Sequence, residues 1–521
     1  MKNKLNIINK INEMIEKNFH KTANGEKAKV LLTGATGTMG SCGLEQMLAA
    51  GYEVTAFSLD TKRDRRVLNR YRKFSNMKVF FGDLTDYQNV YDAIKNVDIV
   101  LHVGAFVSPE ADYHPQRAMD INYNSTMNII NAIKAQGRAD TVKLVYIGTI
   151  AETGDRLPPI QWGRVGDPIK PSVFDYYAVS KVAAERAVIE SGLKYWVSLR
   201  QTGIMSKKMM EISDGIIFHN CLDNVLEFVS DRDSGTLLKN VCGDLPNEFW
   251  GHIYNIGGGE SCRITSFELM SRVFSLVGVD DLSLAVDAKW FATRNFHGQS
   301  YLDSDKLNDY LHFRSDSIDY MIDIERKKFG ILCGISKTLC KFPPFKKLIS
   351  KLIGKVFEKQ IYTAHGTMNF IDNNLEDKIS AYFISKEDWD EITPLNQMQH
   401  FNKWDEIVKI DHGYDESKPE AELTLEDVQN AAKFRGGKCL STSMTIGDWN
   451  TPLQFECSFG HKFTASPRLV LEGGHWCDTC ESESWNYHEI AKVNPFFAQV
   501  WNPLHSPDEL PVLYRKMVQI N

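Results

Sequence analysis

The chain has no uninterrupted run of about 18 apolar residues, so the sequence predicts no membrane-spanning helix. Its basic residues do not outnumber its acidic ones: the formal net charge is −7, and bulk attraction to nucleic acid is not expected. The ten cysteines lack a disulfide-like spacing, and the first residues lack the pattern of a signal peptide. No internal repeat of fixed period is evident. These absences predict a cytoplasmic protein, and 521 residues predict two to four domains.

A glycine-rich turn follows the first apolar run. Residues 29–32 are typical of a buried parallel strand, and a helical pattern follows the segment Thr33-Gly34-Ala35-Thr36-Gly37-Thr38-Met39-Gly40. Gly34 permits a tight turn, Gly37 lets the backbone approach a phosphate, and Gly40 lets the helix pack closely on the strand. The turn therefore predicts binding of a dinucleotide, whose pyrophosphate would lie at the helix N-terminus. An ordinary tight turn is the alternative.

The end of the second expected strand, 53–57, bears on the choice between NAD and NADP. A carboxylate about 20 residues after the glycines would hold the ribose 2′-hydroxyl of NAD, but Ser58 occupies that position. Arg63 lies in a basic segment that could hold the 2′-phosphate of NADP. The sequence therefore leans towards NADP, with a solvated, charged helix start as an equally weighted alternative.

A tyrosine and a lysine lie four residues apart on an expected helix, 176–188, and so share one face. The ammonium of Lys181 is expected to lower the pKa of the Tyr177 phenol from about 10 towards the working pH, where an acid or base works best. Thr149 ends an apolar strand, 142–149, at the sheet edge where ligands bind, and would orient a substrate oxygen. These residues predict proton transfer beside the cofactor, the alternative being a surface pair.

With these motifs, residues from about 27 to 315 resemble an extended short-chain dehydrogenase/reductase of the NAD-dependent epimerase/dehydratase type. Other segments agree with the same family: Gly82-Asp83-Leu84-Thr85-Asp86, Asn122, Arg200-Gln201-Thr202-Gly203, residues 229–233 and residues 254–259. The resemblance implies an α/β fold: a Rossmann-type doubly wound parallel sheet with a small substrate subdomain.

The resemblance also implies hydride transfer at a nicotinamide, with Thr149, Tyr177 and Lys181 as the catalytic set. Together the motifs and the resemblance assign the cofactor to Gly34, Thr36, Gly37, Thr38, Met39, Gly40, Ser58, Arg63, Asp83, Leu84, Val103, Gly104, Asn122, Tyr177, Lys181, Gln201 and Gly203. Ile150 stands where dehydratases of this family usually carry an acid, which argues against dehydration. Simple oxidoreduction and epimerisation remain.

The candidate substrate residues are Ser108, Thr149 and Arg294. Arg294 could meet a phosphate or a carboxylate, although a surface arginine is the favoured alternative. Residues 205–220 are rich in methionine and isoleucine and could form a flexible wall for an apolar ketone.

Residues 326–360 combine many basic side chains with an apolar stripe at helical spacing after Pro343-Pro344. Such a helix can lie on an anionic membrane surface. A helix packed on the enzyme domain, with its lysines in water, is the favoured alternative.

Two short-spaced pairs near the C-terminus have the pattern of a zinc site. Cys457 and His461 are followed, after fifteen residues, by Cys477 and Cys480, and zinc needs four such N/S ligands in a tetrahedron. Cys439 is a spare candidate. Residues 430–505 resemble small zinc-ribbon modules. Because protein ligands fill all four positions, a structural Zn²⁺ is expected, and the module could serve a protein partner, nucleic acid or subunit contacts.

The sequence therefore predicts four regions: an amphipathic helix (1–25), an enzyme domain (26–325, divided near residue 200 into cofactor and substrate parts), a basic helical region and linker (326–425), and a zinc-ribbon-like domain (426–521). The expected function is an NAD(P)-dependent oxidoreductase. The alternatives are a nucleotide-sugar epimerase that retains NAD, and a cofactor-sensing regulatory protein. A homodimer is expected by analogy with the family.

Overall fold

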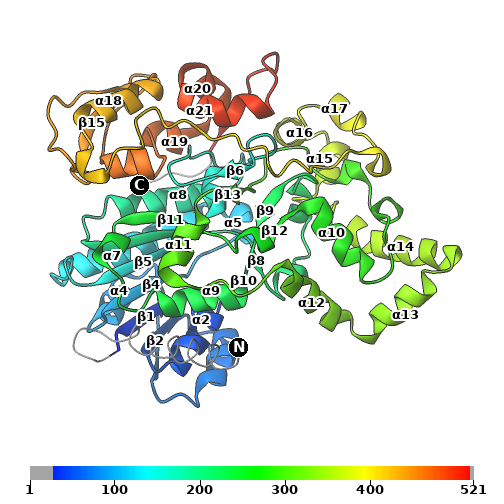
Figure 1. Ribbon diagram of the computed structural model, residues 1–521. Helices are drawn as coiled ribbons and strands as arrows, with labels where there is room; N and C mark the ends of the chain where they lie inside the picture. The colour runs from blue at the N-terminus through cyan, green and yellow to red at the C-terminus, as the bar shows by residue number, and fades with distance from the viewer. Residues whose placement is uncertain (1–26, 517–521) are drawn as a thin grey trace, which may run out of the picture.

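A seven-stranded parallel β-sheet forms the centre of the molecule (Figure 1). The computed structural model describes residues 27–516, so the helix predicted over residues 1–25 lies outside the described residues. The sheet order is β11-β7-β5-β4-β1-β2-β3, with the bounds β1 (Lys29–Thr33), β2 (Glu53–Ser58), β3 (Met77–Phe81), β4 (Ile99–His102), β5 (Lys143–Thr149), β7 (Tyr195–Gln201) and β11 (His252–Ile256). This order reverses direction beside β1, as in doubly wound α/β sheets, and the predicted fold class is confirmed.

Helices cover both faces of the sheet because side chains of the strands alternate between the faces. Leu31 and Leu144 belong to one hydrophobic cluster, whereas Leu32 and Val145 belong to another. The first cluster includes side chains of α4 (Tyr87–Ile94), α7 (Ser125–Ala135) and α8 (Tyr176–Ile189). The second includes side chains of α2 (Thr38–Ala49), α9 (Asp231–Asn240) and α11 (Ser304–Leu311). The strands are thus buried on both sides.

A small subdomain lies beyond the carboxyl ends of the strands. Its short strand pairs are β8 (Ile204–Met205) with β10 (Val229–Ser230), β9 (Val225–Glu227) with β12 (Arg263–Thr265), and β6 (Trp162–Gly163) with β13 (Ser300–Tyr301). Helix α10 (Ser266–Ser275) follows β12, and its Phe274 is buried in a separate hydrophobic cluster. This is the region expected to bind substrate.

Three consecutive helices, α12 (Ile318–Phe329), α13 (Ile331–Leu339) and α14 (Pro343–Glu358), extend from this subdomain on the right of Figure 1. Ile349, Ile353 and Phe357 of α14 pack against the cluster that contains Phe274. The opposite side of α14 remains exposed. The predicted apolar stripe is therefore divided between a packed half and an exposed half. Helices α15 (Thr367–Asp372), α16 (Glu376–Phe383) and α17 (Lys386–Asp390) follow.

The C-terminal module shares a core with the enzyme domain. Its elements are α18 (Leu425–Phe434), β14 (Lys438–Cys439), β15 (Leu453–Glu456), β16 (Lys462–Ala465), α19 (Asp478–Glu483), β17 (Ser484–Trp485), α20 (Tyr487–Val493), α21 (Pro495–Trp501) and β18 (Tyr514–Arg515). Leu469 and Trp476 belong to the same cluster as Val188 of α8. The segment before the module, predicted as a linker, is also held down, because His412 is buried and contacts the Asp167 carboxylate at 3.0 Å.

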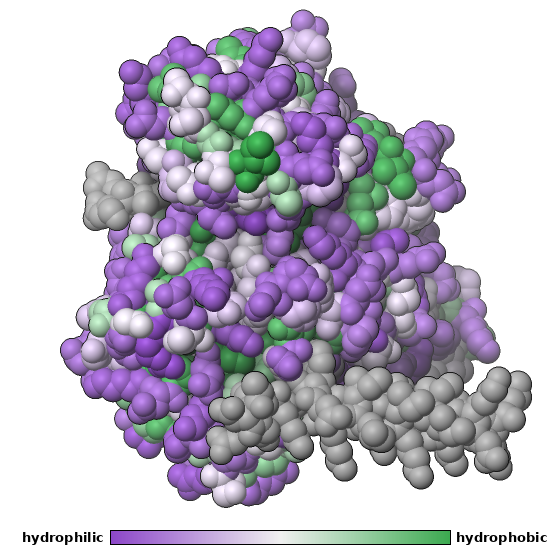
Figure 2. Space-filling view, turned by 60° about the vertical axis from the view of Figure 1, so that its left-hand side comes forward, coloured by the Kyte–Doolittle hydropathy of each residue, from purple (hydrophilic) through white to green (hydrophobic). Residues whose placement is uncertain are grey.

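The outer surface on the side of this module is mainly hydrophilic, with hydrophobic side chains in smaller groups (Figure 2). Among residues 27–516, no helix combines the length and the hydropathy that crossing a bilayer requires.

We expect Gly40→Ala to destabilise the fold. A Cβ at Gly40 would lie 2.2 Å from the Gly34 carbonyl oxygen, and backbone at this position cannot rotate away. Overpacking of this kind costs about 1–3 kcal/mol. The matched control is Gly334→Ala on α13, where a Cβ meets nothing within 4 Å and should stabilise the helix by roughly 0.5–1 kcal/mol. Urea denaturation gives the free energy of unfolding of both variants. If Gly40→Ala were as stable as Gly334→Ala, the packing argument would be contradicted.

Candidate functional site

The turn after β1 forms a cradle in which side chains have no room. Gly34 has a φ of +67°, and a Cβ there would lie 2.7 Å from the Cα of Gly104 in the loop after β4. Helix α2 begins at the N-cap Gly37, where no side chain accepts a hydrogen bond and no acidic residue occupies the first turn. The unpaired N–H groups and the helix dipole favour a phosphate at this position. The cradle therefore fits the pyrophosphate of a dinucleotide.

The loops that follow β3 and β4 are locked to this cradle. The Thr33 hydroxyl accepts hydrogen bonds from the N–H groups of Val103 (3.0 Å) and Gly104 (2.9 Å). Asn122 accepts a bond from Phe106 N and donates one to the Ser180 hydroxyl at 2.8 Å. Leu84 approaches Gly104, so these predicted positions are brought together with Gly34, Thr36, Gly37, Thr38, Met39 and Gly40.

Two carboxylates near the cradle are Asp83, which was expected from the sequence, and Asp64, which was not. Asp83 is turned to its own loop, where it accepts a hydrogen bond from Thr85 N at 2.9 Å. The buried Asp64 of α3 (Lys62–Leu68), which the sequence reasoning missed, accepts a hydrogen bond from Thr36 at 2.7 Å. The signal available for it was the Thr61-x-x-Asp64 spacing of a helix start.

The positions that bear on a 2′-phosphate lie beside Asp64. Ser58 is buried at the end of β2, and its hydroxyl donates to the Leu59 carbonyl. Arg63 is exposed at the start of α3, and Asp60 pairs with Arg65. Arg63 thus remains accessible to a 2′-phosphate.

The three predicted catalytic residues lie together at the carboxyl end of β5 and on the first turns of α8. The Thr149 hydroxyl lies beside the phenol of Tyr177, where it acts to lower the pKa of that phenol. The buried ammonium of Lys181 donates to the Ile147 carbonyl at 2.7 Å and lies 4.1 Å from the ring centre of Tyr146. All three side chains are therefore placed by the sheet edge and one helix.

The electrostatics of the set differ from the expected pattern. Burial raises the pKa of Tyr177, and the neighbouring Thr149 hydroxyl only partly opposes this shift. Burial lowers the pKa of Lys181 to about 8, although the nearby carboxylates Glu152 and Glu185 oppose it. The expected lowering of the Tyr177 pKa by Lys181 is therefore not present in the cofactor-free chain.

A buried network of charged side chains contacts Thr149 and continues into the C-terminal module. The Glu152 carboxylate accepts a hydrogen bond from Thr149 N at 3.0 Å and lies 3.4 Å from the Arg200 guanidinium. Arg200 pairs with Glu185 at 2.6 Å, and Glu185 in turn lies 3.2 Å from the imidazole of His475 in the C-terminal module. Burial and the charge of Glu185 hold the pKa of Glu152 well above its usual range.

A cavity of about 1350 Å³ opens beside Tyr177. Ser108, Gly203 and Asp112 line it at this end. Most of the wall is apolar and comes from the substrate subdomain, α12 and α14; it includes Met209, Ile216, Leu226, Phe228, Met270, Phe274, Phe296, Met321 and Phe357. The expectation of an apolar wall near residues 205–220 agrees with this lining.

Several cavity residues were not found from the sequence because distant segments supply them. Lys378 and Tyr382 come from α16, and Tyr514 comes from β18 near the C-terminus. Arg294, by contrast, is neither the surface arginine that the sequence favoured nor part of this cavity's lining, because it is buried elsewhere. It pairs with Glu509 at 2.7 Å and donates to the Ser380 carbonyl, so it fastens the C-terminal segment to the enzyme domain. Gln201 ends β7, where its side chain donates to the Thr202 carbonyl.

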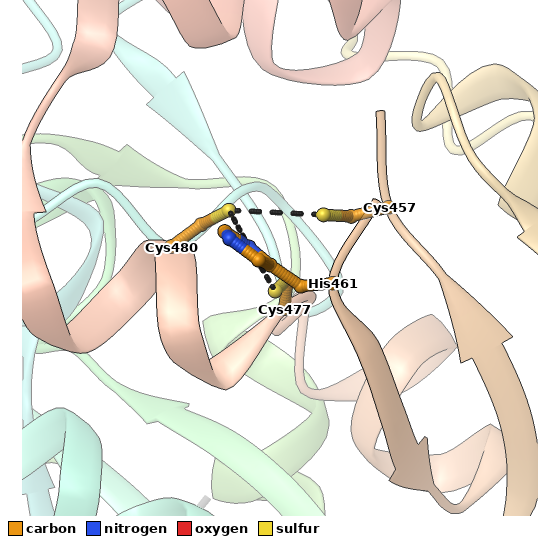
Figure 3. Close-up of side chains that lie close together, drawn as sticks. All are labelled: Cys457, His461, Cys477 and Cys480. Carbon is orange, nitrogen blue, oxygen red and sulfur yellow. Dashed lines mark hydrogen bonds between the residues drawn. The ribbon is translucent and has the colours of Figure 1, made fainter. Parts of the chain in front are cut away.

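The four predicted metal ligands converge between the β15–β16 hairpin and the start of α19 (Figure 3). Their ligand atoms all lie within 4.8 Å of one another. The Cys457 and Cys480 sulfurs are 3.9 Å apart, and the His461 Nδ1 lies 3.3 Å from the Cys480 sulfur. Three thiols and one imidazole at these separations fit the donor set and size of a tetrahedral zinc site. Cys439 is not a member of this cluster.

Comparisons with known proteins agree with the enzyme domain. Residues 30–219 match the model of the NAD dependent epimerase/dehydratase family, which supports the family resemblance for this region. Human sterol-4-alpha-carboxylate 3-dehydrogenase, decarboxylating, is 29% identical over 181 residues, which cover 34% of this chain and 43% of that protein. UDP-glucose 4-epimerase of Rickettsia typhi is 30% identical over 111 residues, covering 20% and 32%.

Among solved structures, the dTDP-glucose 4,6-dehydratase DesIV from Streptomyces venezuelae, with NAD and TYD bound, is similar at 20% identity. The match covers 58% of this chain and 98% of that chain, with a TM-score of 0.47. The chain spans less than half the length of the two curated relatives above.

We expect the stability of the chain to depend on the ionisation of Asp112. Burial raises the pKa of this carboxyl to about 7, and repulsion by Asp175 adds to the shift, whereas the unfolded value is about 3.9. Between about pH 4 and 7 the folded chain binds a proton that the unfolded chain has lost. The free energy of unfolding should therefore fall as the pH rises through this window, by up to about 4 kcal/mol.

Asp112→Asn should remove this decline, because the amide stays neutral and can still accept the hydrogen bond that Tyr176 N donates at 2.9 Å. Urea denaturation across the pH window measures the difference. The control is Asp140→Asn, an exposed loop position that should keep the wild-type slope. An unchanged slope in Asp112→Asn would contradict the assignment.

Proposed function

We propose that the chain is an NAD(P)-dependent oxidoreductase that acts on a hydroxyl or carbonyl carbon of an apolar small molecule. The observation that carries the proposal is the position of Tyr177. Its phenol lies beside the Thr149 hydroxyl and lines a largely apolar cavity, at the carboxyl edge of a sheet whose first turn fits a dinucleotide. The similarity of residues 30–219 to the epimerase/dehydratase family supports it.

Each residue of the site has a separate role in the proposed reaction. When bound, the nicotinamide supplies or accepts the hydride. The cradle at Gly34, Gly37 and Gly40 would hold the pyrophosphate, and Lys181 would hold the nicotinamide ribose. Thr149 orients the substrate oxygen, and Tyr177 exchanges a proton with it. Because burial raises the pKa of Tyr177, its phenol is protonated before the cofactor binds, which is the acid form that carbonyl reduction needs.

The cavity supports an apolar substrate of considerable size. Its volume of about 1350 Å³ exceeds the roughly 300–1,000 Å³ of ordinary ligand sites. Aliphatic, methionine and aromatic side chains make up most of the wall, and the charged groups include Asp112 and Lys378. The human relative named above is a sterol-carboxylate dehydrogenase, which supports the same class of substrate.

An epimerase that retains NAD is the second candidate, supported by the similarity to UDP-glucose 4-epimerase. The two candidates differ in net cofactor turnover: an oxidoreductase consumes added cofactor, and an epimerase does not. Arg63 remains a candidate for holding the 2′-phosphate of NADP.

We also propose that Cys457, His461, Cys477 and Cys480 bind a structural Zn²⁺. The support is the convergence of four protein ligand atoms within 4.8 Å, which leaves no coordination position open for a substrate. The ion would fix the start of α19. That segment also carries Glu481, which pairs with Arg186 of α8 at 3.1 Å.

Tyr177→Phe should abolish turnover, since it removes the proton that the substrate oxygen exchanges. General acid–base groups contribute about 10²- to 10⁴-fold, so kcat should fall by at least that range. The assay is the absorbance of NADPH or NADH with apolar ketones, compared with UDP-sugars. Fluorescence titration should show unchanged cofactor affinity. Tyr123→Phe, which alters a half-buried tyrosine outside the cavity, is the control, and a Tyr177→Phe chain with wild-type kcat would refute the proposal.

Cys477→Ser should abolish zinc binding, whereas Cys439→Ser should keep one zinc per chain. The reason is that Cys439 is also a thiol of the module but stands outside the cluster. Inductively coupled plasma mass spectrometry of the purified variants gives the ratio of zinc to protein. Full zinc content in Cys477→Ser, or loss in both variants, would refute the ligand assignment.

A further inference from the structure

We propose that α13 and α14 dock the protein onto the surface of an anionic lipid bilayer, with the helices lying in the plane of the interface. The docking face is defined by exposed apolar side chains on these helices and on the turn between them: Ile331, Leu332, Ile335, Leu339, Phe342, Phe345, Leu348, Leu352 and Val356.

The exposed apolar side chains are concentrated on this face. It holds nine of the 28 exposed large hydrophobic residues in the described part of the chain, although it spans only residues 331–356. Ile331 is 83% exposed, Leu352 is 56% exposed and Val356 is 60% exposed. Single exposed apolar residues are ordinary, but a contiguous group marks an interaction surface.

The helical spacing of α14 separates its docking half from its folding half. Phe345, Leu348, Leu352 and Val356 recur every three or four residues and form one exposed stripe, while the packed side chains occupy the neighbouring positions on the inner side. The exposed stripe is therefore not needed to hold α14 on the enzyme domain. With 16 residues, α14 is about 24 Å long and would lie along a surface.

Charge identifies the kind of surface. Residues 326–359 carry ten basic side chains and one acidic one, a net charge of +9, whereas the rest of the chain carries −16. Lys347, Lys351 and Lys355 form a second stripe, each one position before a residue of the apolar stripe, and all three are exposed. Among the described residues, no carboxylate pairs with these three lysines. Apolar groups flanked by free lysines match the acyl boundary and the anionic headgroups of a bilayer.

The same charges argue against a second copy of the chain as the occupant. An isologous dimer through this face would bring two +9 segments together. The basic side chains of the two copies would repel each other in such a contact, whereas an anionic lipid surface would attract them.

The docking face also borders the cavity. Val356 is exposed and lines the cavity, and Ile353 and Phe357 on the inner side of the same helix line it too. Docking would place this rim of the cavity at the lipid surface. An apolar substrate could then pass between bilayer and cavity, a consequence that rests on the proposed function, whereas docking itself does not.

Vesicle co-sedimentation of the full-length protein tests the proposal, with phosphatidylcholine vesicles that contain or lack phosphatidylglycerol. The wild type should sediment with the anionic vesicles and be released by salt. Each lysine near an anionic surface contributes roughly a fivefold increase in partitioning. Lys347→Gln/Lys351→Gln/Lys355→Gln should therefore weaken binding by about a hundredfold, and Leu348→Ser/Leu352→Ser should weaken it without changing the net charge.

The matched control variants replace lysines and aliphatic side chains that lie outside the docking face. Lys403→Gln/Lys409→Gln/Lys433→Gln alters three exposed lysines, and Ile407→Ser/Ile446→Ser alters two aliphatic side chains that are 54% and 66% exposed. Both controls should sediment like the wild type, and thermal melting should show that all variants are folded. Failure of the wild type to sediment, equal losses in the controls, or a dimer that needs the docking face would overturn the proposal.

The readout separates docking from catalysis. Tyr177→Phe should bind vesicles like the wild type, because its side chain lies inside the cavity. If the wild type does not bind vesicles, the docking proposal fails and the oxidoreductase proposal still stands. If the wild type binds vesicles but has no oxidoreductase activity, the docking proposal stands and the oxidoreductase proposal fails.

Discussion

The buried guanidinium of Arg200 is the interaction on which the arrangement of the molecule depends. Arg200 is 1% exposed on the inner strand β7, and burying such a charge is costly unless it is fully paired. Glu185 of the enzyme domain supplies one partner at 2.6 Å, but the carbonyl of Gly473, in the C-terminal module, supplies another at 2.7 Å. The enzyme domain thus contains a buried charge to which the module supplies one hydrogen-bond acceptor, so the two regions are joined at this guanidinium.

The same charge network contacts the residues that we propose to be catalytic. Glu185 lies four residues after Lys181 on α8, so the residue that neutralises Arg200 and the residue proposed to hold the cofactor share one helix face. Glu152 faces Arg200 on the other side and accepts the hydrogen bond from Thr149 N that caps the turn after β5. Burial, together with the charge of Glu185, raises the pKa of Glu152, whereas Arg200 and His475 overcome the effect of burial at Glu185 and lower its pKa.

Local patterns in the sequence predicted the parts of the site that depend on neighbouring residues. The glycine turn, the strand end at Thr149 and the Tyr177/Lys181 spacing all lie within single elements, and the structure has these elements within a residue or two of the predicted bounds. The four metal-ligand candidates also converge, because two tight turns bring each pair together locally.

Features that depend on distant segments could not be predicted in this way. Arg294 was a candidate for contact with substrate, but it pairs with Glu509, which lies 215 residues later in the chain. Lys378 and Tyr514 enter the cavity from segments with no recognisable motif. For α14, the apolar periodicity indicated which residues avoid water in an isolated helix. It could not show that the enzyme domain covers only half of them.

The C-terminal module reaches the catalytic tyrosine through the segment that begins at its cysteine cluster. Helix α19 leads directly into β17, where the buried Trp485 packs against Tyr176, the neighbour of Tyr177, with ring centres 5.4 Å apart. Trp485 also contacts Phe174, whose ring lies 3.5 Å below the Lys378 ammonium in the cavity wall. A metal ion that fixed α19 would therefore hold the backbone segment that packs against Tyr176, the neighbour of the tyrosine proposed to be catalytic. By this route the module would support the proposed site from the face that it buries against the enzyme domain.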